Sequence, residues 1–270
     1  MTDLRSIAPT VAEILGIPVP SGAEGAPIAE VLDTLPSAEK IGLVILDGFG
    51  SSLWGSLEGV VPTMNRLAGL HCEEIFSVRP TLTYVCISSI LTGMSPRSHG
   101  VTDLKEAVEV VQFGQIETLF GTARRAGRRT MLAAHREGVG DLPLSQFVDD
   151  LIIAEGNEDA QLYAQVPNVL RRVKPDLAFV HLIDIDEAAH KWGPYSVQVK
   201  EVAARMDRSL DGLLRVFAEA KNAVILLADH GVHEEQGDPN LGSHDGSVEE
   251  DLLVPLIWAS REELQAIYLK

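Results

Sequence analysis

Three short apolar runs, each followed closely by an acidic side chain, constrain most strongly what this chain can fold into. They span Ile41 to Leu46, Leu177 to Ile183 and Ala223 to Ala228. Such runs are typical of strands that are buried on both faces of a parallel sheet. Parallel neighbours need long crossover connections, which are usually helices, so we expect helices between these strands.

Helical and extended segments alternate along the rest of the chain. The other predicted strands are Glu73 to Val78, Arg129 to Ala134, Phe147 to Ile153 and Leu252 to Trp258. The predicted helices are Thr10 to Leu15, Ile28 to Leu32, Met64 to Leu70, a segment starting near Thr83, Ile116 to Ala126, Asp159 to Val173 and Val197 to Ala220. This alternation predicts a three-layer α/β/α sandwich with a mainly parallel central sheet. Because no linker is long enough to separate two domains, we expect one domain over residues 1–270.

The composition excludes some partners. Of the 270 residues 46% are apolar, which is enough for a substantial core, and the formal net charge is −17. A charge of this sign argues against a nucleic-acid polymer or an anionic membrane as the main partner. An acidic protein that handles phosphate esters needs local positive charge, and bound metal ions can supply it.

Cysteine use and the start of the chain bear on the compartment. Cys72 and Cys86 are too few for a disulfide framework and indicate a reducing environment. The first residues do not resemble a signal peptide, and no apolar run is long enough to span a membrane. We therefore expect a cytoplasmic protein, with the oligomeric state left open.

Acidic residues and histidines gather directly after the three apolar runs. The carboxyl ends of parallel strands meet at one edge of a sheet, so these side chains are expected to converge. Carboxylate and imidazole donors together suit zinc, manganese or iron, and there are enough of them for two ions. Two ions can clamp the attacking and leaving oxygens of a phosphoryl transfer. The candidate ligands are Asp47, Asp186, His190, Asp229, His230 and His244.

Each candidate also has a purely structural interpretation. Asp47 and Gly48 could form a turn, and Asp186 and His190 could be an ion pair on a helix surface. The remaining candidates could end a strand or lie in a loop. Their joint occurrence after successive apolar strands favours the metal site.

The segment Pro80 to Gly100 is predicted to be a strand end, a turn and a helix. Its apolar residues have helical spacing until Gly93, and Thr83 falls in the first turn. The start of a helix offers free N–H groups and a positive dipole end, so a hydroxyl there can attack phosphorus while the amides hold the phosphoryl oxygens. The alternative is that Thr81 or Thr83 only caps the helix.

Five separated motifs resemble, in the same order, those of the alkaline phosphatase superfamily. The nearest branch is the type I phosphodiesterase/nucleotide pyrophosphatase group, which has Asp-Gly after the first strand, Pro-Thr-x-Thr, Thr-Gly-x-x-Pro-x-x-His-Gly, Asp-x-x-x-His with Gly-Pro, and Asp-His-Gly before a last ligand histidine. The corresponding residues are Asp47-Gly48, Pro80 to Thr83, Thr92 to Gly100, Asp186 to Pro194, Asp229 to Gly231 and His244. The resemblance extends from about Ile41 to Trp258.

The resemblance implies a role for each residue. Thr83 would be the nucleophile, would form a phospho-threonine intermediate and would bridge toward the first metal. Asp47, Asp229 and His230 would hold that first ion, and Asp186, His190 and His244 a second. The ions would be zinc, with manganese as the alternative, and the substrate a small-molecule phosphodiester or nucleotide pyrophosphate. His99 and the remaining histidines match no ligand position and are expected to be structural residues with satisfied rings, namely His71, His135, His181 and His233.

Other functions stay open at this point. A phosphomonoesterase or a phosphonate hydrolase of the same superfamily would use the same ligands. A sulfatase is disfavoured because Cys86 is not part of a Cys-x-Pro-x-Arg sequence. A non-catalytic metal- or phosphate-binding protein is the alternative from another class.

The sequence departs from the family pattern in two places. Cys86 stands where the branch usually has an asparagine that donates to a phosphoryl oxygen, and a thiol is a weak donor. Residues 1–36 resemble the closing segment of superfamily members, moved to the N-terminus, which suggests a circular permutation. We find no insertion large enough for a cap domain, so loops such as Val101 to Gly114 and Gly231 to Gly246 are expected to set specificity.

Overall fold

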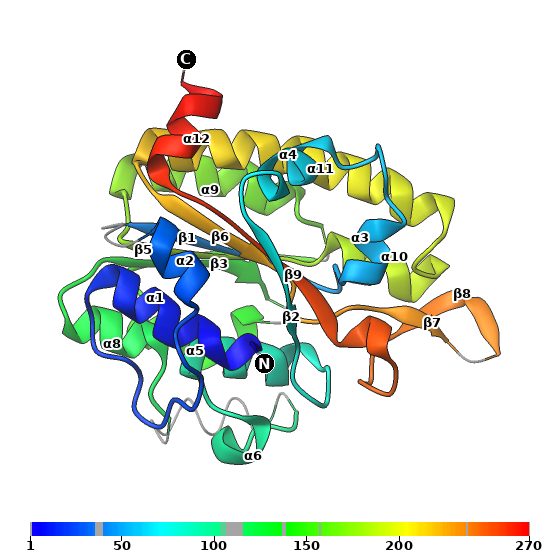
Figure 1. Cartoon of the computed structure of the whole chain (residues 1–270), viewed down its shortest axis with the longest axis horizontal. Helices are drawn as coiled ribbons and strands as arrows, with labels where there is room; N and C mark the ends of the chain where they lie inside the picture. The colour runs from blue at the N-terminus through cyan, green and yellow to red at the C-terminus, as the bar shows by residue number, and fades with distance from the viewer. Residues whose placement is uncertain are drawn as a thin grey trace.

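A seven-stranded sheet with helices on both faces forms the body of the molecule (Figure 1). The computed structural model describes residues 2–35, 40–103, 105, 116–136, 139–156, 158–235 and 237–269. One face carries α1 (Ile7–Leu15), α5 (Thr83–Thr92) and α8 (Leu119–Arg125), and the other carries α4 (Pro62–Ala68), α9 (Ala160–Val173) and α11 (Val197–Ala220). This three-layer arrangement confirms the predicted fold class.

The sheet is parallel except for one strand. Its order is β2-β9-β6-β1-β5-β3-β4, and β9 is antiparallel to both of its neighbours. The strands are β1 (Ile41–Leu46), β2 (Cys72–Phe76), β3 (Thr130–His135), β4 (Asp150–Ala154), β5 (Leu177–Leu182), β6 (Ala223–Leu227) and β9 (Leu253–Ala259). The three apolar runs of the sequence are therefore β6, β1 and β5, which lie side by side in the middle of the sheet.

Shorter elements complete the described part of the chain. The remaining α-helices are α2 (Ala29–Thr34), α3 (Ser51–Gly55), α6 (Pro96–His99), α10 (Asp184–Trp192) and α12 (Arg261–Tyr268). Four 3-10 helices are η1 (Leu4–Ser6), η2 (Val139–Asp141), η3 (Pro143–Phe147) and η4 (Glu249–Asp251), and a separate hairpin pairs β7 (His233–Glu235) with β8 (Asp238–Ser243).

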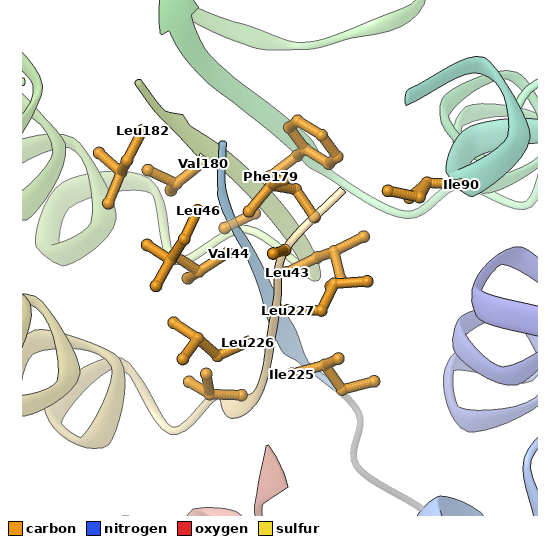
Figure 2. Packing of buried hydrophobic residues seen from close by; sticks show 14 of the residues in the cluster. Leu43, Val44, Leu46, Ile90, Phe179, Val180, Leu182, Ile225, Leu226 and Leu227 are labelled. Atoms are coloured by element: carbon orange, nitrogen blue, oxygen red, sulfur yellow. The ribbon is translucent and has the colours of Figure 1, made fainter. Parts of the chain in front are cut away.

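The core lies on both faces of the central strands, because successive side chains of a strand point to opposite sides. Figure 2 shows Leu43 on the side of Ile90 of α5, whereas Val44 and Leu46 point to the opposite side. These side chains are at most 2% exposed. Burial on both faces explains why these strands read as continuous apolar runs rather than as alternating ones.

The structure corrects the sequence interpretation in several places. The predicted loop Gly231 to Gly246 contains the β7–β8 hairpin, and helix α10, which begins directly after the predicted strand Leu177 to Ile183, was not predicted. Helix α12 was not predicted. Much of the loop Val101 to Gly114 lies outside the described residues. The predicted strands and helices otherwise agree with the structure to within about three residues at each end.

The N-terminal segment lies beside the edge strand β2. The backbone N–H of Phe76 donates to the Thr2 carbonyl at 3.0 Å, and Asp3 forms an isolated bridge to Phe76. Phe76 in turn pairs with Leu253 of β9 on its other side. The origin of residues 1–36 by permutation stays a prediction. Among the helices that the structure describes, none has both the length and the apolar character needed to cross a membrane.

Candidate active site

The three candidate carboxylate ligands lie at the carboxyl ends of the three central strands. Asp47 directly follows β1, Asp229 comes two residues after β6, and Asp186 lies in the first turn of α10, which begins just after β5. Since β6, β1 and β5 are adjacent, parallel and paired almost end to end, their final residues meet at one edge of the sheet. The convergence expected from the sequence is present in the structure.

The first donor group surrounds His230. The Nε2 atom of His230 lies 3.2 Å from Asp47 Oδ1 and 3.5 Å from Asp229 Oδ2. The Thr83 hydroxyl lies 3.4 Å from the same nitrogen. Asp229 is held in place by its other oxygen, which accepts from the backbone N–H of His230 at 3.0 Å and of Gly48 at 3.4 Å. Four predicted site residues thus point at one small volume.

The second donor group combines α10 with the loop after β8. His190 Nε2 lies 3.2 Å from Asp186 Oδ2 and 2.9 Å from His244 Nε2. His244 Nε2 is 3.7 Å from Asp186 Oδ1. The rings of His230 and His244 stack with centroids 3.9 Å apart, so the two groups form one continuous cluster.

Backbone carbonyls set the orientation of the three imidazoles. The Nδ1–H of His190 donates to the Gly242 carbonyl at 2.9 Å, and that of His244 donates to the Thr81 carbonyl at 2.6 Å. His230 Nδ1 lies 3.1 Å from the Gly231 carbonyl. A carbonyl can only accept, so Nδ1 carries hydrogen in each ring and Nε2 is left to face the cluster. This is the usual way in which proteins orient metal-binding histidines.

Two glycines allow the close approaches that the site requires. Gly48 has φ +69°, and a Cβ there would lie 2.6 Å from Asp186 Oδ1. A Cβ on Gly242 would lie 2.6 Å from the Ala189 carbonyl of α10, so only glycine lets this strand bring its own carbonyl to His190. A side chain at either position would push the second donor group apart.

Crowded carboxylates and imidazoles perturb one another strongly. A hydrogen bond to Asp186 raises the pKa of His190 to about 9. Burial disfavours charge on His230, but the carboxylates of Asp229 and Asp47 outweigh it and raise the pKa of that ring to about 10. Burial and the nearby Asp47 raise the pKa of Asp229 to about 7. Burial and the neighbouring His230 lower the pKa of His244. Such mutual perturbation is typical of functional sites.

The residues present fit divalent cations. One oxygen each of Asp47, Asp186 and Asp229 is buried without a hydrogen-bond partner. Burying an unpartnered carboxylate oxygen is costly, and a coordinated cation removes that cost. The three imidazoles offer their Nε2 atoms to the same region. A mixed carboxylate and imidazole donor set suits zinc and similar transition metals.

Zinc binding is expected to release protons, because a histidine must be neutral to bind a metal. At pH 8 both His190 and His230 are protonated in the metal-free protein, since their pKa values are about 9 and about 10. Binding of one zinc ion at each of the two donor groups should therefore release about two protons in total. The zinc affinity of each donor group should rise about tenfold per pH unit below these pKa values. Calorimetry in buffers of different ionisation enthalpy measures the number of protons that are released when zinc binds. A His190→Gln variant should release about one proton fewer than the wild type. Zinc binding by the wild type without proton release would contradict the assignment of His190 and His230 as metal ligands.

Thr83 lies at the start of α5 and faces a small cavity. The residue before it, Leu82, is the N-cap and makes no side-chain capping bond, so neither threonine caps the helix through its hydroxyl. The cavity has a volume of about 100 Å³, and Asp47, Thr83, His181 and Asp186 are among its lining residues. The hydroxyl is thus placed against the donor cluster at a helix N-terminus, which is favourable for an anion.

Cys86 lies one helical turn after Thr83 and is fully buried. Its sulfur lies 3.4 Å from the Ser77 hydroxyl, and Ser77 donates to the Asp229 carbonyl at 2.6 Å. Burial and the nearby Asp229 carboxylate raise the pKa of the Cys86 thiol well above its usual value. The thiol therefore stays protonated and unreactive at neutral pH.

Three residues near the site were not identified from the sequence as contributing to it. Asp159 is buried and accepts from His135 Nε2 and from the backbone N–H groups of Ile183 and Asp184, which fixes the junction between β5 and α10. Asp251 is buried and accepts from His233 and from the N–H of Gly246, which fixes the loop that carries His244. No short-range sequence signal identifies either residue, because their partners are distant along the chain.

His181 is the third. The prediction that the His181 ring makes hydrogen bonds is wrong. Neither ring nitrogen has a hydrogen-bond partner, even though the residue is only 1% exposed and so cannot rely on solvent. The other four histidines outside the donor groups behave as expected. His99 contacts the Ser89 hydroxyl and accepts from the N–H of Val101. His71 contacts Glu263 and stacks on Trp258, and His135 and His233 contact buried carboxylates. The sequence did contain a signal for His181, because a histidine inside the apolar run Leu177 to Ile183 is unusual for a buried strand.

A mainly parallel sheet with candidate acidic and histidine ligands at its central strand ends, facing a threonine at a helix start, is the arrangement that the resemblance to the alkaline phosphatase superfamily implies. The family model for type I phosphodiesterase/nucleotide pyrophosphatase matches residues 43–261. The chain therefore belongs to the type I phosphodiesterase/nucleotide pyrophosphatase family.

Individual relatives agree with this assignment. Venom phosphodiesterase 2 of Crotalus adamanteus is 27% identical over 217 residues, which cover 71% of this chain and 26% of that protein. The chain thus spans about a quarter of the length of this relative. Among solved structures, the C-terminal periplasmic domain of EptC from Escherichia coli in complex with Zn matches with a TM-score of 0.63 and 15% identity, covering 85% of this chain and 74% of that one.

A further solved structure is an inactive threonine-to-alanine variant of murine ENPP5 in complex with AMP. It matches with a TM-score of 0.51 and 17% identity, and it covers 73% of this chain and 58% of that chain. At these identities the structural likenesses establish the shared fold.

Proposed function

We propose that this chain is a two-metal phosphoesterase that hydrolyses phosphodiester or nucleotide pyrophosphate bonds of small molecules. The observation that carries the proposal is the position of the Thr83 hydroxyl, 3.4 Å from His230 Nε2 and beside three buried carboxylates. Asp47, Asp229 and His230 would hold a first ion, and Asp186, His190 and His244 a second, with zinc favoured over manganese by the three imidazoles. Bound divalent ions supply Lewis-acid stabilisation of phosphoryl oxygens and lower the pKa of a coordinated hydroxyl or water.

The proposed reaction has two steps at phosphorus. The Thr83 oxygen forms a bond to phosphorus while the bond to the leaving oxygen breaks, and the hydroxyl proton passes to the leaving oxygen. The step leaves a phospho-threonine that keeps the remaining ester group of the substrate and releases an alcohol or nucleotide product. Water then attacks the same phosphorus, and the bond to Thr83 breaks and restores the hydroxyl. The N-terminus of α5 is oriented to stabilise the phosphoryl charge in both steps.

Buried Cys86 bears on how tightly phosphate is held. At the position of Cys86 the family usually has an asparagine, whose side-chain amide is a good donor. A protonated thiol that already contacts Ser77 is a weak donor. We therefore expect the backbone amides at the start of α5 to take a larger share of phosphoryl binding. A cytoplasmic location remains part of the proposal and is supported by the two free thiols, of which Cys72 is exposed.

A substrate panel tests the proposed function. The purified protein would be assayed with a phosphate diester, a nucleotide pyrophosphate, a phosphate monoester and a phosphonate, each with Zn²⁺ and with Mn²⁺. We expect the diester or the pyrophosphate to be hydrolysed fastest with Zn²⁺. A faster monoester or phosphonate reaction would select one of the alternative activities of the superfamily. Full metal occupancy with no turnover of any compound would show a metal-binding protein without this catalysis.

A further inference from the structure

His181 is a buried imidazole beside the first donor group, and no motif of the chain accounts for it. It lies on β5, opposite Ile45 of β1 in the register of the sheet. Its Nε2 lies 3.3 Å from Asp47 Oδ2, whereas Asp47 Oδ1 faces His230. Asp47 therefore stands between two imidazoles, of which only His230 belongs to the expected ligand set.

The ring of His181 lacks the partners that a buried structural histidine normally has. Neither nitrogen makes a hydrogen bond, because the approach to Asp47 has ion-pair distance without hydrogen-bond geometry. Asp47 Oδ1 and Asp229 Oδ2 are buried and unpartnered as well. Leaving so many polar atoms unpaired in one place is costly, and buried polar groups in native proteins are nearly always satisfied. The cluster has the composition of a cation site.

Space and distance agree with that interpretation. One donor atom from each of Asp47, His181 and Asp229 lies within 4.8 Å of the other two. His181 also lines the cavity of about 100 Å³ that Thr83 and Asp47 share. The ring thus reaches the volume in which the first ion is proposed to bind, rather than packing behind it.

We propose that His181 is a further protein ligand of the first metal ion, beside Asp47, Asp229 and His230. This inference rests on the proposed function for the presence of that ion. A second imidazole makes the site richer in nitrogen, and imidazole suits zinc, copper, iron and nickel, whereas oxygen ligands suit magnesium and manganese. His181 would therefore make the first site selective for zinc over manganese.

Two substitutions separate a ligand from a residue that only orients Asp47. His181→Gln keeps an N–H donor that can reach the Asp47 carboxylate but binds transition metals weakly, and His181→Phe removes both functions. His99→Gln is the matched control, because His99 is also buried but contacts Ser89 and the N–H of Val101, outside the donor cluster. Thermal unfolding of each metal-free variant checks that it folds.

Zinc affinity, measured by competition with a chromophoric chelator, is the main readout. We expect both His181 variants to lose more than about 100-fold in affinity at one of the two sites, which exceeds the usual effect of losing an outer hydrogen bond to a ligand. Their manganese affinity should change much less, and His99→Gln should bind both metals as the wild type does. A zinc affinity of His181→Gln within about 100-fold of the wild type would overturn the proposal, and a loss of about 10- to 100-fold would leave His181 as a positioning residue.

X-ray absorption of the wild-type protein loaded with two zinc ions gives an answer without any variant. The proposal expects four imidazole ligands over the two ions, from His181, His190, His230 and His244, and three would overturn it. Failure of this proposal can be distinguished from failure of the proposed function. Four imidazoles with no ester hydrolysis would refute the phosphoesterase alone, whereas hydrolysis with three imidazoles would refute only the role of His181.

Discussion

Replacing Thr83 by alanine is expected to reduce turnover of a phosphate ester by about 10⁴-fold or more while the bound metal is retained. The reason is that the hydroxyl, 3.4 Å from His230 Nε2, is the atom proposed to bond to phosphorus, and alanine leaves the donor cluster otherwise intact. Steady-state kinetics on the best substrate of the panel and metal analysis of the same preparation are the two measurements. Thr83→Ser keeps a hydroxyl and should retain part of the activity.

Thr92→Ala is the matched control for this experiment. Thr92 is the last residue of α5 and donates to the Ser88 carbonyl at 2.7 Å, at the opposite end of the helix from Thr83. The variant should turn over substrate within about tenfold of the wild-type rate, since it loses only two local hydrogen bonds, the one to Ser88 and one from the N–H of Met94, each worth about 1 kcal/mol. Acid quenching during turnover should trap the phosphoryl group of the substrate, with its remaining ester group, on Thr83 and on no other residue. Normal turnover by Thr83→Ala would reject Thr83 as the nucleophile.

Removing the metal is expected to abolish activity and to lower the thermal midpoint by about 10 °C. Asp47, Asp186 and Asp229 each bury one carboxylate oxygen without a partner, so a cation bound only by the folded state stabilises it. At zinc concentrations about 1,000-fold above the dissociation constant, binding contributes about 4 kcal/mol, and each kcal/mol shifts the midpoint of a chain of this size by about 2–4 °C. Chelation followed by differential scanning calorimetry, with and without added zinc, measures the shift.

The double variant Asp186→Asn, His244→Ala identifies the source of this stabilisation. It removes two of the three donors of the second group and should show a smaller zinc-dependent shift of the thermal midpoint than the wild type.

Calcium added to the metal-free protein should not restore activity, because calcium prefers oxygen ligands alone. If the chelated protein keeps full activity, the metal-dependent mechanism is wrong.

The fold was predictable because local patterns and burial agree along most of the chain. The run Ile41 to Leu46 could be assigned to a buried strand because both of its faces are apolar, and the structure places β1 at the middle of the sheet. The hairpin within Gly231 to Gly246 could not be predicted. Its strands are short and mostly polar, and its position follows from contact with α10, which no local pattern encodes.

The candidate site divides in the same way. Asp47, Asp186 and Asp229 could be assigned to one site because each follows an apolar strand, and parallel strands end at a common edge. Asp159 and Asp251 could not be found, because each acts through hydrogen bonds to backbone groups that the tertiary fold brings to it. The partner of a buried carboxylate is a matter of three-dimensional packing, which spacing along the chain does not record.

Residue type and order were enough to predict the layered α/β architecture and to choose the candidate metal-binding side chains. The folded chain was needed to learn that β6, β1 and β5 are neighbours, that Thr83 faces His230, and that His181 is unsatisfied beside Asp47. Strand order and the direction of a buried side chain depend on competition among many non-local contacts. An isolated motif contains none of those contacts.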